Sequence, residues 1–220
     1  MPTSIKENYL KALHFLSQQS AEVSVTGLGM AMGVSKPTAS DMVKKLKNKG
    51  WVKHDKYQPI QLTESGRRTA ALVIRKHRLS ELFLNQVMGF GWEEVHNIAE
   101  ELEHIKSDLF FQRIDEMLGH PRFDPHGSPI PDASGKMVTP TYTLLSQISQ
   151  PCKVVIKALK QADPDFLIYL NDKNIELGTE LEITSIENFD GSMTVHYGHC
   201  QQMVISQAVT MLLWVEIISC

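Results

Sequence analysis

The sequence predicts an α+β multi-domain protein with a winged helix-turn-helix, a helical domain and a small C-terminal β-barrel. Two helical patterns joined by a glycine turn precede a short hairpin pattern, and two long amphipathic helical patterns follow. Period-two alternation dominates the last third of the chain, after a linker-like stretch at 132–148. These observations place the three predicted domains at 1–72, 73–140 and 141–220.

The first domain has the pattern of a winged helix. Ser35 is placed to cap the third helix, and Pro37 falls in that helix's first turn, where a missing N–H costs nothing. Gly33 supplies the turn before the cap, and Gly50 closes the helix. Helices are predicted over 4–18, 24–32 and 36–48, and the two strands of the wing over 51–54 and 59–62.

The charge distribution predicts double-stranded DNA as the partner of this domain. Residues 1–78 carry 14 Lys and Arg against 5 Asp and Glu, whereas residues 79–220 carry 8 against 20. Lysines neutralise phosphates, and residues near the start of a recognition helix reach base edges in the major groove. The candidate DNA-binding residues all belong to the third helix or its cap: Ser35, Lys36, Pro37, Thr38, Ser40, Lys44, Lys45 and Lys47.

The middle of the chain is predicted to form two long helices, over 63–88 and 92–118, separated by Gly89 and Gly91. Both have a large apolar stripe. Such helices next to a DNA-binding module favour a homodimer interface, because a two-fold protein reads a palindromic site.

Imidazole and carboxylate side chains gather at helical spacing on these two helices. His77 and Glu81 stand one turn apart on the first. On a helix over 92–118, four donors share one face: His96, Glu100, Glu103 and His104. The apolar face opposite them would contain Ile98, Leu102, Ile105 and Leu109. Clusters of this composition predict bound divalent metal.

A rigid loop follows the second helix. Residues 119–131 contain four prolines, and Asp124 and His126 flank Pro125. A carboxylate and an imidazole held in a stiff loop are plausible additional metal ligands.

The last part of the chain predicts a β-barrel of about 70 residues. Strands are expected over 152–156, 180–183, 193–197 and 213–217, with a short helix over 163–171.

Several classes of protein are disfavoured. No apolar run reaches membrane length, and no signal peptide is apparent at the N-terminus. The three cysteines form no Cys-x-x-Cys, which favours reduced thiols and a cytoplasmic location. An enzyme is not expected, nor a small-molecule substrate. Two Glu-x-x-His elements, Glu93 to His96 and Glu101 to His104, superficially match those of di-iron carboxylate bundles, but both lie on one predicted helix, whereas the bundles need them on two. A winged-helix repressor that senses a small organic ligand, with a merely solvated His/Glu face, remains the alternative.

The chain resembles the diphtheria toxin repressor family of metal-dependent transcriptional repressors, in the longer form with a C-terminal SH3-like domain related to FeoA. The resemblance covers nearly the whole chain. The segments that carry it are Glu7–Leu10, Ser35–Ser40, Arg75–Glu81, Val95–His104, Pro125–Gly127 and Leu177–Ile183.

The resemblance implies two metal sites per subunit. One would use Glu100, Glu103 and His104 with a ligand from the first helix, at the position of Asn8. The second would use His77 and Glu81, with His96 or the Asp124/His126 loop, and an acidic group of the C-terminal domain, for which Asp163 is the candidate.

The resemblance also bears on which metal is bound. Iron-type actinobacterial members have Cys at the position of Glu100, and manganese-type members have Glu. An oxygen-rich site suits Mn²⁺ or Fe²⁺, and we expect Mn²⁺ in preference. Metal would link the first helix to the dimerisation helices and favour the DNA-competent dimer, so that the repressor controls metal-uptake and homeostasis genes.

Overall fold

The computed structural model describes residues 3–20, 22–56, 58–198 and 202–219. The chain forms two compact units, and helices α4 (Glu64–Gln86) and α5 (Val95–Leu102) each continue from one unit into the other. Among the described residues, no helix is both long and apolar enough to cross a membrane. The first unit comprises Met1–Ser80, Ile98–Arg122 and Ile130–Val138, and the second Glu81–Asn97, Phe123–Pro129 and Thr139–Cys220.

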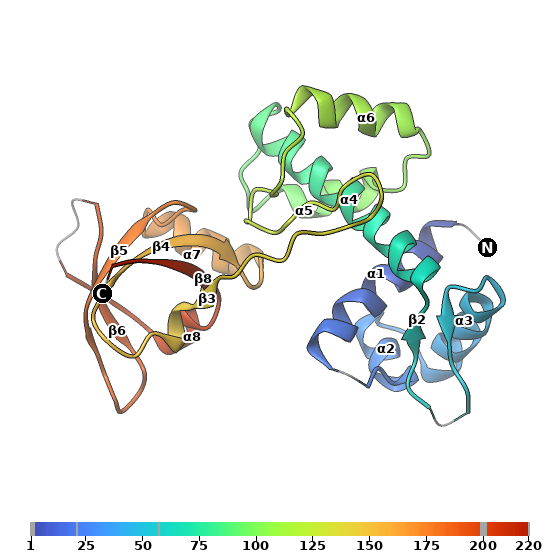
Figure 1. Cartoon of the computed structure of the whole chain (residues 1–220), viewed down its shortest axis with the longest axis horizontal. Coiled ribbons are helices and arrows are strands. Elements are labelled where there is room, and N and C mark those ends of the chain that lie inside the picture. Colours follow the sequence, from blue (N-terminus) through green and yellow to red (C-terminus); the bar gives the residue numbers. More distant parts are fainter. Residues whose placement is uncertain (1–2, 21, 57, 199–201, 220) are drawn as a thin grey trace. The chain divides into compact units, whose positions relative to one another are not determined.

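The first unit begins with the predicted winged helix (Figure 1). Ser24 and Ser35 cap α2 and α3, each accepting a hydrogen bond from a backbone N–H three residues on. Leu10, Leu28 and Leu46 bring α1, α2 and α3 onto one buried core. The elements are α1 (Thr3–Gln19), α2 (Val25–Ala31), α3 (Lys36–Asn48), β1 (Val52–Lys53) and β2 (Gln61–Leu62), with the two strands antiparallel.

The helical part differs from the prediction in one respect. Helix α4 (Glu64–Gln86) agrees with it, but the single helix expected over 92–118 is two helices, α5 (Val95–Leu102) and α6 (Asp108–Met117). Ser107 caps α6 by accepting a hydrogen bond from Phe110 N at 3.2 Å. A new cap satisfies the N–H groups of a second helix, so the chain leaves the helical path between the two. Glu103 and His104 therefore lie in the turn after α5.

The predicted faces of this segment were also partly wrong. Val95, Ala99 and Glu103 are buried, whereas Ile98 and Leu102 are only half-buried. Leu109, expected in the core, is 61% exposed. The break after α5 ends the helical periodicity from which Leu109 had been placed.

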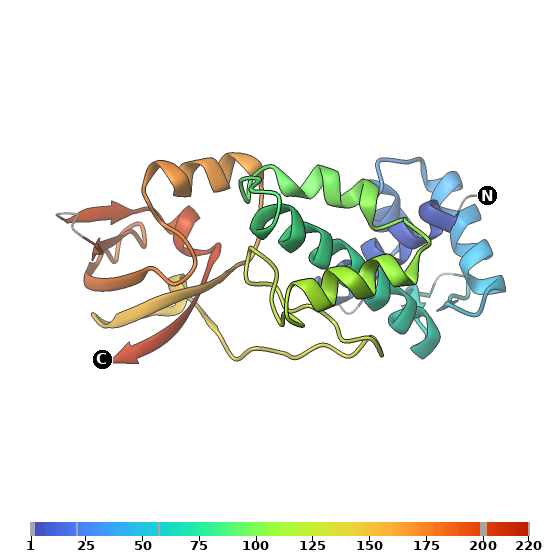
Figure 2. The ribbon, with the colours of Figure 1, turned by 90° about the horizontal axis from the view of Figure 1, so that it is seen from above.

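The second unit contains a six-stranded antiparallel sheet with strand order β3-β8-β4-β5-β6-β7. Helix α7 (Pro164–Asp172) lies beside this sheet (Figure 2). Its Leu167 and Leu170 belong to the same buried core as the sheet residues. The four predicted strands and the predicted helix over 163–171 are present, as β4, β5, β6, β8 and α7. The edge strands β3 and β7 and the short helices η1 and α8 were missed, because they are too short to show a period. The elements are β3 (Thr143–Leu144), the 3₁₀-helix η1 (Leu145–Gln147), β4 (Lys153–Leu159), α7 (Pro164–Asp172), β5 (Glu180–Ile186), β6 (Met193–His196), β7 (Met203–Ile205), α8 (Gln207–Thr210) and β8 (Leu213–Ser219).

Candidate metal centres and nucleic-acid interface

The first unit brings together one group of metal-ligating side chains, here called the first donor group: His77, Glu100 and Glu103. One potential ligand atom of each lies within 4.8 Å of those of the others. The Nδ1 atom of His77 lies 2.7 Å from Oε2 of Glu103. His77 comes from α4, Glu100 from α5 and Glu103 from the following turn, so three separate segments converge.

Glu103 is the most deeply buried member of this group. Its side chain is 0% exposed. Burial by itself would raise the pKa of this carboxyl, but the contact with His77 and the charge of Lys11 more than offset burial, so the pKa of Glu103 is lowered. Glu103 is therefore an anion in the interior of the protein, which requires a cationic partner.

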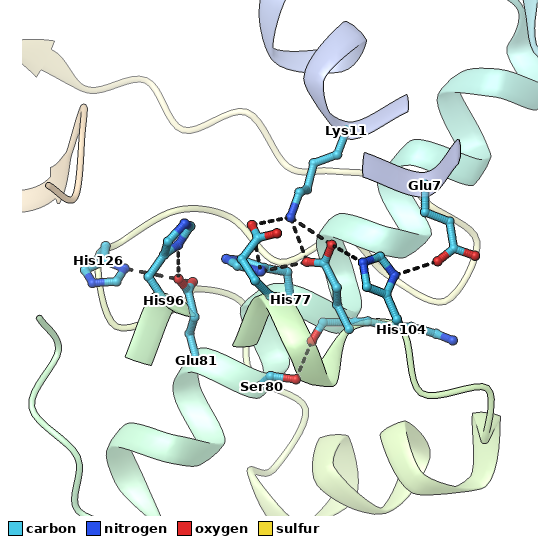
Figure 3. A network of polar contacts seen from close by, with 11 residues as sticks. Glu7, Lys11, His77, Ser80, Glu81, His96, His104 and His126 are labelled. Atoms are coloured by element: carbon cyan, nitrogen blue, oxygen red, sulfur yellow. Dashed lines mark hydrogen bonds and ion pairs between the residues drawn. The ribbon is translucent and has the colours of Figure 1, made fainter. Parts of the chain in front are cut away.

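Two side chains of α1 contact this group and the adjacent His104 (Figure 3). Lys11 Nζ lies 2.8 Å from both carboxylate oxygens of Glu103 and 2.5 Å from Oε1 of Glu100. The Nδ1 atom of His104 lies 2.8 Å from Oε2 of Glu7. Because a carboxylate only accepts, His104 donates through Nδ1, and its Nε2 lies 3.6 Å from Glu103 Oε1. This orientation leaves Nε2 as the nitrogen available for the predicted role of His104 as a ligand.

Asn8, the predicted ligand from the first helix, is half-buried. Its Oδ1 atom is buried and accepts no hydrogen bond from the residues that the structure describes. A buried amide oxygen without a partner is costly unless something else satisfies it. The role of Asn8 as a neutral oxygen ligand stays a prediction.

The second unit contains a second donor group, formed by Glu81, Asp124 and His126. All three side chains are buried, and their ligand atoms lie within 4.8 Å of one another. The Nδ1 atom of His126 lies 3.9 Å from Glu81 Oε2. His96, with 52% of its side chain exposed, places Nδ1 3.3 Å from Glu81 Oε1. The predicted pairing of His77 with Glu81, four residues apart along α4, stays a prediction.

The loop that carries Asp124 and His126 is held against β4. Leu159 N donates to the carbonyl of His126 at 2.9 Å. Asp124 Oδ1 accepts from the backbone N–H groups of His126 and Ser128, both at 2.9 Å. Gly127, with φ +83°, lies so close to β4 that a Cβ atom there would meet Lys157 O at 2.2 Å. Backbone contacts therefore fix the two predicted ligands.

Trp92 connects this loop to helix α7. Its carbonyl lies 2.9 Å from His126 Nε2, and its ring stacks on the imidazole. Since a carbonyl only accepts, Nε2 carries the hydrogen, and Nδ1, which faces Glu81, is the nitrogen available for the predicted role of His126 as a ligand. The indole Nε1 of Trp92 donates to Asn171 Oδ1 at 2.7 Å, and Asn171 Nδ2 donates to Glu93 Oε2 at 3.1 Å.

Asp163, the predicted ligand from the C-terminal domain, caps α7. Its Oδ1 atom accepts a hydrogen bond from Asp165 N at 3.1 Å, and the side chain is exposed. Asp163 belongs to none of the donor groups found among the described residues. Its role as a ligand stays a prediction.

We expect Asn171→Ala to weaken metal binding at the second donor group by about tenfold, the lower end of the cost of losing an outer-shell contact. The change removes the anchor of the Trp92 ring, whose own carbonyl orients His126. Affinity is measured by two-site competition with a metal-binding dye. Asp172→Ala, at the exposed neighbouring position of α7, is the control. Equal affinities for Asn171→Ala and wild type would contradict the expectation.

The predicted DNA-binding residues lie at the start and along the outer face of α3. Ser35, Lys36, Pro37 and Thr38 are exposed, and Ser40 is half-buried. Of the three later lysines, all exposed, Lys44 pairs with Asp41 at 3.1 Å, and Lys47 contacts His54 O and Asp55 in the wing. The side of α3 that faces the core is formed by Ala39, Met42, Val43 and Leu46.

Glu7 and Lys11, which contact His104 and the first donor group, were not among the predicted metal ligands. Glu7 and Lys11 lie four residues apart, so they share a face of α1 with Asn8. That polar face, opposite the apolar stripe, was the available signal in the sequence. Their partners lie 89 to 97 residues away along the chain, which no local pattern reports.

The chemistry of both donor groups fits a divalent first-row metal. Each combines two carboxylates with one imidazole, and the described part of the chain places no thiolate among them. Oxygen-rich sites with some nitrogen suit Mn²⁺ and Fe²⁺ better than metals that prefer sulfur.

Three family models match the chain. Residues 1–60 match the iron-dependent repressor N-terminal DNA-binding domain, and residues 63–132 match the iron-dependent repressor metal-binding and dimerisation domain. Residues 143–217 match the FeoA domain. These matches confirm the predicted α+β multi-domain fold, with a small all-β C-terminal domain of the SH3-like kind.

Relatives of known function agree with the models. The iron-dependent repressor IdeR of Mycobacterium tuberculosis is 30% identical, over 77% of this chain and 79% of the relative. The diphtheria toxin repressor of Corynebacterium diphtheriae is 29% identical, over 93% of this chain and 94% of that relative. A solved manganese-dependent transcriptional repressor in complex with manganese is 34% identical, with a TM-score of 0.86 over 97% of this chain and all of that one. The match supports the metal-dependent function and not the organic-ligand alternative. The chain belongs to the iron-dependent repressor family of metal-dependent, DNA-binding transcriptional repressors.

Proposed function

We propose that this chain represses metal-uptake and homeostasis genes in response to Mn²⁺, or to Fe²⁺ as the second choice. It would bind a palindromic operator as a homodimer, with up to two metal ions per subunit. We propose that it catalyses no reaction and has no small-molecule substrate. We also propose a cytoplasmic location, where its DNA partner lies.

One observation carries this proposal: a helix of the DNA-binding domain is tied to the first donor group. Glu7 and Lys11 of α1 contact His104 and Glu103 in the turn after α5. Whatever occupies this group therefore affects the position of α1 within the first unit. A divalent cation would supply the positive charge that holds these carboxylates and imidazoles together.

The coupling is a linkage between two binding events. If metal favours one position of α1, and that position suits the operator, each ligand strengthens the binding of the other by the same factor. A coupling of about 1–3 kcal/mol would change operator affinity by roughly 5- to 150-fold. That range is enough for a repressor to respond to metal supply.

The preference for Mn²⁺ rests on Glu100 and on the similar proteins. Glu100 contributes an oxygen where a cysteine would favour softer metals. The manganese-bound repressor and the manganese regulator SloR are 34% and 33% identical to this chain. A relative described as an iron-dependent repressor is 30% identical in sequence to this chain, so Fe²⁺ stays the second choice.

The test measures operator affinity at free-metal concentrations set by metal buffers. We expect Mn²⁺ to raise the affinity by at least about tenfold, within the usual range of allosteric coupling, and a chelator to reverse the effect. Fe²⁺ under anaerobic conditions is expected to act at higher free concentration. Equal operator affinity with metal and with chelator would contradict the proposal.

A further inference from the structure

Lys11 occupies the first donor group although it cannot be a metal ligand while protonated. Its side chain is 12% exposed and extends from α1 to the two carboxylates (Figure 3). Nζ lies 2.5 Å from Glu100 Oε1 and 2.8 Å from both oxygens of Glu103. Glu103 is fully buried and Glu100 is 33% exposed. The ammonium thus places a positive charge against two carboxylates in a poorly solvated place.

A metal ion at this group would need the same oxygens. Glu100 and Glu103 are two of its three members, and Lys11 contacts both. An ammonium and a divalent cation that share these oxygens would lie within a few ångströms of each other, where like charges repel strongly in a site of low effective dielectric constant. The two cations therefore exclude each other.

The lysine side chain can leave the carboxylates without unfolding α1. Its four-carbon stem is flexible and its ammonium is readily hydrated, so the side chain can turn to solvent. The imidazole of His104 is held separately by Glu7, and so it keeps its orientation when Lys11 moves.

We infer that Lys11 is an internal counter-cation, which holds Glu100 and Glu103 in the metal-free protein and must be displaced when a divalent metal binds, so that it sets the free-metal concentration at which the repressor responds. This inference rests on the proposed function. Lys11 acts on metal affinity by competition and contributes no ligand. Without it, the carboxylates would repel each other in the metal-free protein and bind metal more tightly.

The test compares Lys11→Met with wild type and with two controls. Lys11→Arg keeps the positive charge, and Lys6→Met removes the same charge five residues earlier on α1. Mn²⁺ affinity is measured without DNA, by competition with a metal-binding dye. The melting temperatures of the metal-free and Mn²⁺-saturated proteins are measured by circular dichroism.

We expect Lys11→Met to bind Mn²⁺ at least about tenfold more tightly, a factor within the usual range of coupling between two ligands. Its metal-free melting temperature should fall, and the rise on adding Mn²⁺ should be larger than in wild type. Lys11→Arg and Lys6→Met should stay close to wild type. Lys11→Gln should change in the same direction as Lys11→Met and replaces it if the methionine variant does not fold.

The double variant Lys11→Met/Glu103→Gln locates the effect by comparison with Glu103→Gln alone. We expect these two variants to have the same Mn²⁺ affinity, because the carboxylate that Lys11 occupies is absent from both. Tighter Mn²⁺ binding by the double variant than by Glu103→Gln would overturn the inference. Unchanged or weaker Mn²⁺ binding by Lys11→Met and Lys11→Gln, beside a wild type that binds Mn²⁺, would overturn the role of Lys11 and leave the proposed function intact. A wild type that binds no Mn²⁺ and no Fe²⁺ would overturn both.

Discussion

Glu103→Gln is expected to abolish the response of operator binding to metal. The carboxylate is fully buried, and its two oxygens meet Lys11 and His77 within 2.8 Å. Replacing it by an amide removes an anionic oxygen that we predict to bind the metal, while keeping the shape of the side chain. Loss of outer-shell contacts alone costs 10–100-fold, so loss of this ligand should weaken metal binding by at least about 100-fold. The measurements are Mn²⁺ affinity by dye competition and operator affinity with and without Mn²⁺.

The matched control is Glu101→Gln, the same change of charge two residues earlier. Glu101 lies on α5 and is exposed. It should keep the metal response of wild type. Circular dichroism of both variants checks whether a loss in Glu103→Gln comes from unfolding. A normal Mn²⁺ response in folded Glu103→Gln would remove the first donor group from the mechanism.

Gly127→Ala is expected to destabilise the second unit strongly and to weaken metal binding at the second donor group. At φ +83° a side chain is strained, at a cost of about 1–2 kcal/mol. The added Cβ would also meet Lys157 O at 2.2 Å and Ala158 Cα at 2.6 Å. Backbone atoms cannot move aside cheaply, and overpacking adds about 1–3 kcal/mol. The total loss in the free energy of unfolding is therefore about 2–5 kcal/mol, measured by urea unfolding.

Gly178→Ala separates the two causes. Gly178 lies in the same unit at φ +90°, and a Cβ there would meet nothing within 4 Å. It should cost only the backbone strain, about 1–2 kcal/mol, and leave metal affinity unchanged. In Gly127→Ala the loop must shift from β4, which moves His126 with it. Equal losses in the two variants would show that the contact with β4 is unimportant.

Local sequence patterns predicted much of the fold. The turn glycine Gly33, the cap Ser35 and Pro37 are each determined by backbone stereochemistry within a few residues, and α3 begins where they predict. The long helix α4 and the four main strands were recognisable because their apolar periods extend over enough residues. The break between α5 and α6 was missed because Ser107 is compatible both with the interior of a helix and with a cap, and local preferences of this size are easily overridden.

The sequence by itself determined which residue types are available for metal and DNA: the His and Glu pattern, the proline-rich loop and the basic third helix. Only the tertiary structure decided which of them meet. It placed Lys11 against Glu103, which lies 92 residues later, and it linked Asn171 through Trp92 to His126. Such pairings depend on the packing of distant segments, where burial makes an unpaired charge or polar group costly. Spacing along the chain carries no information about that cost.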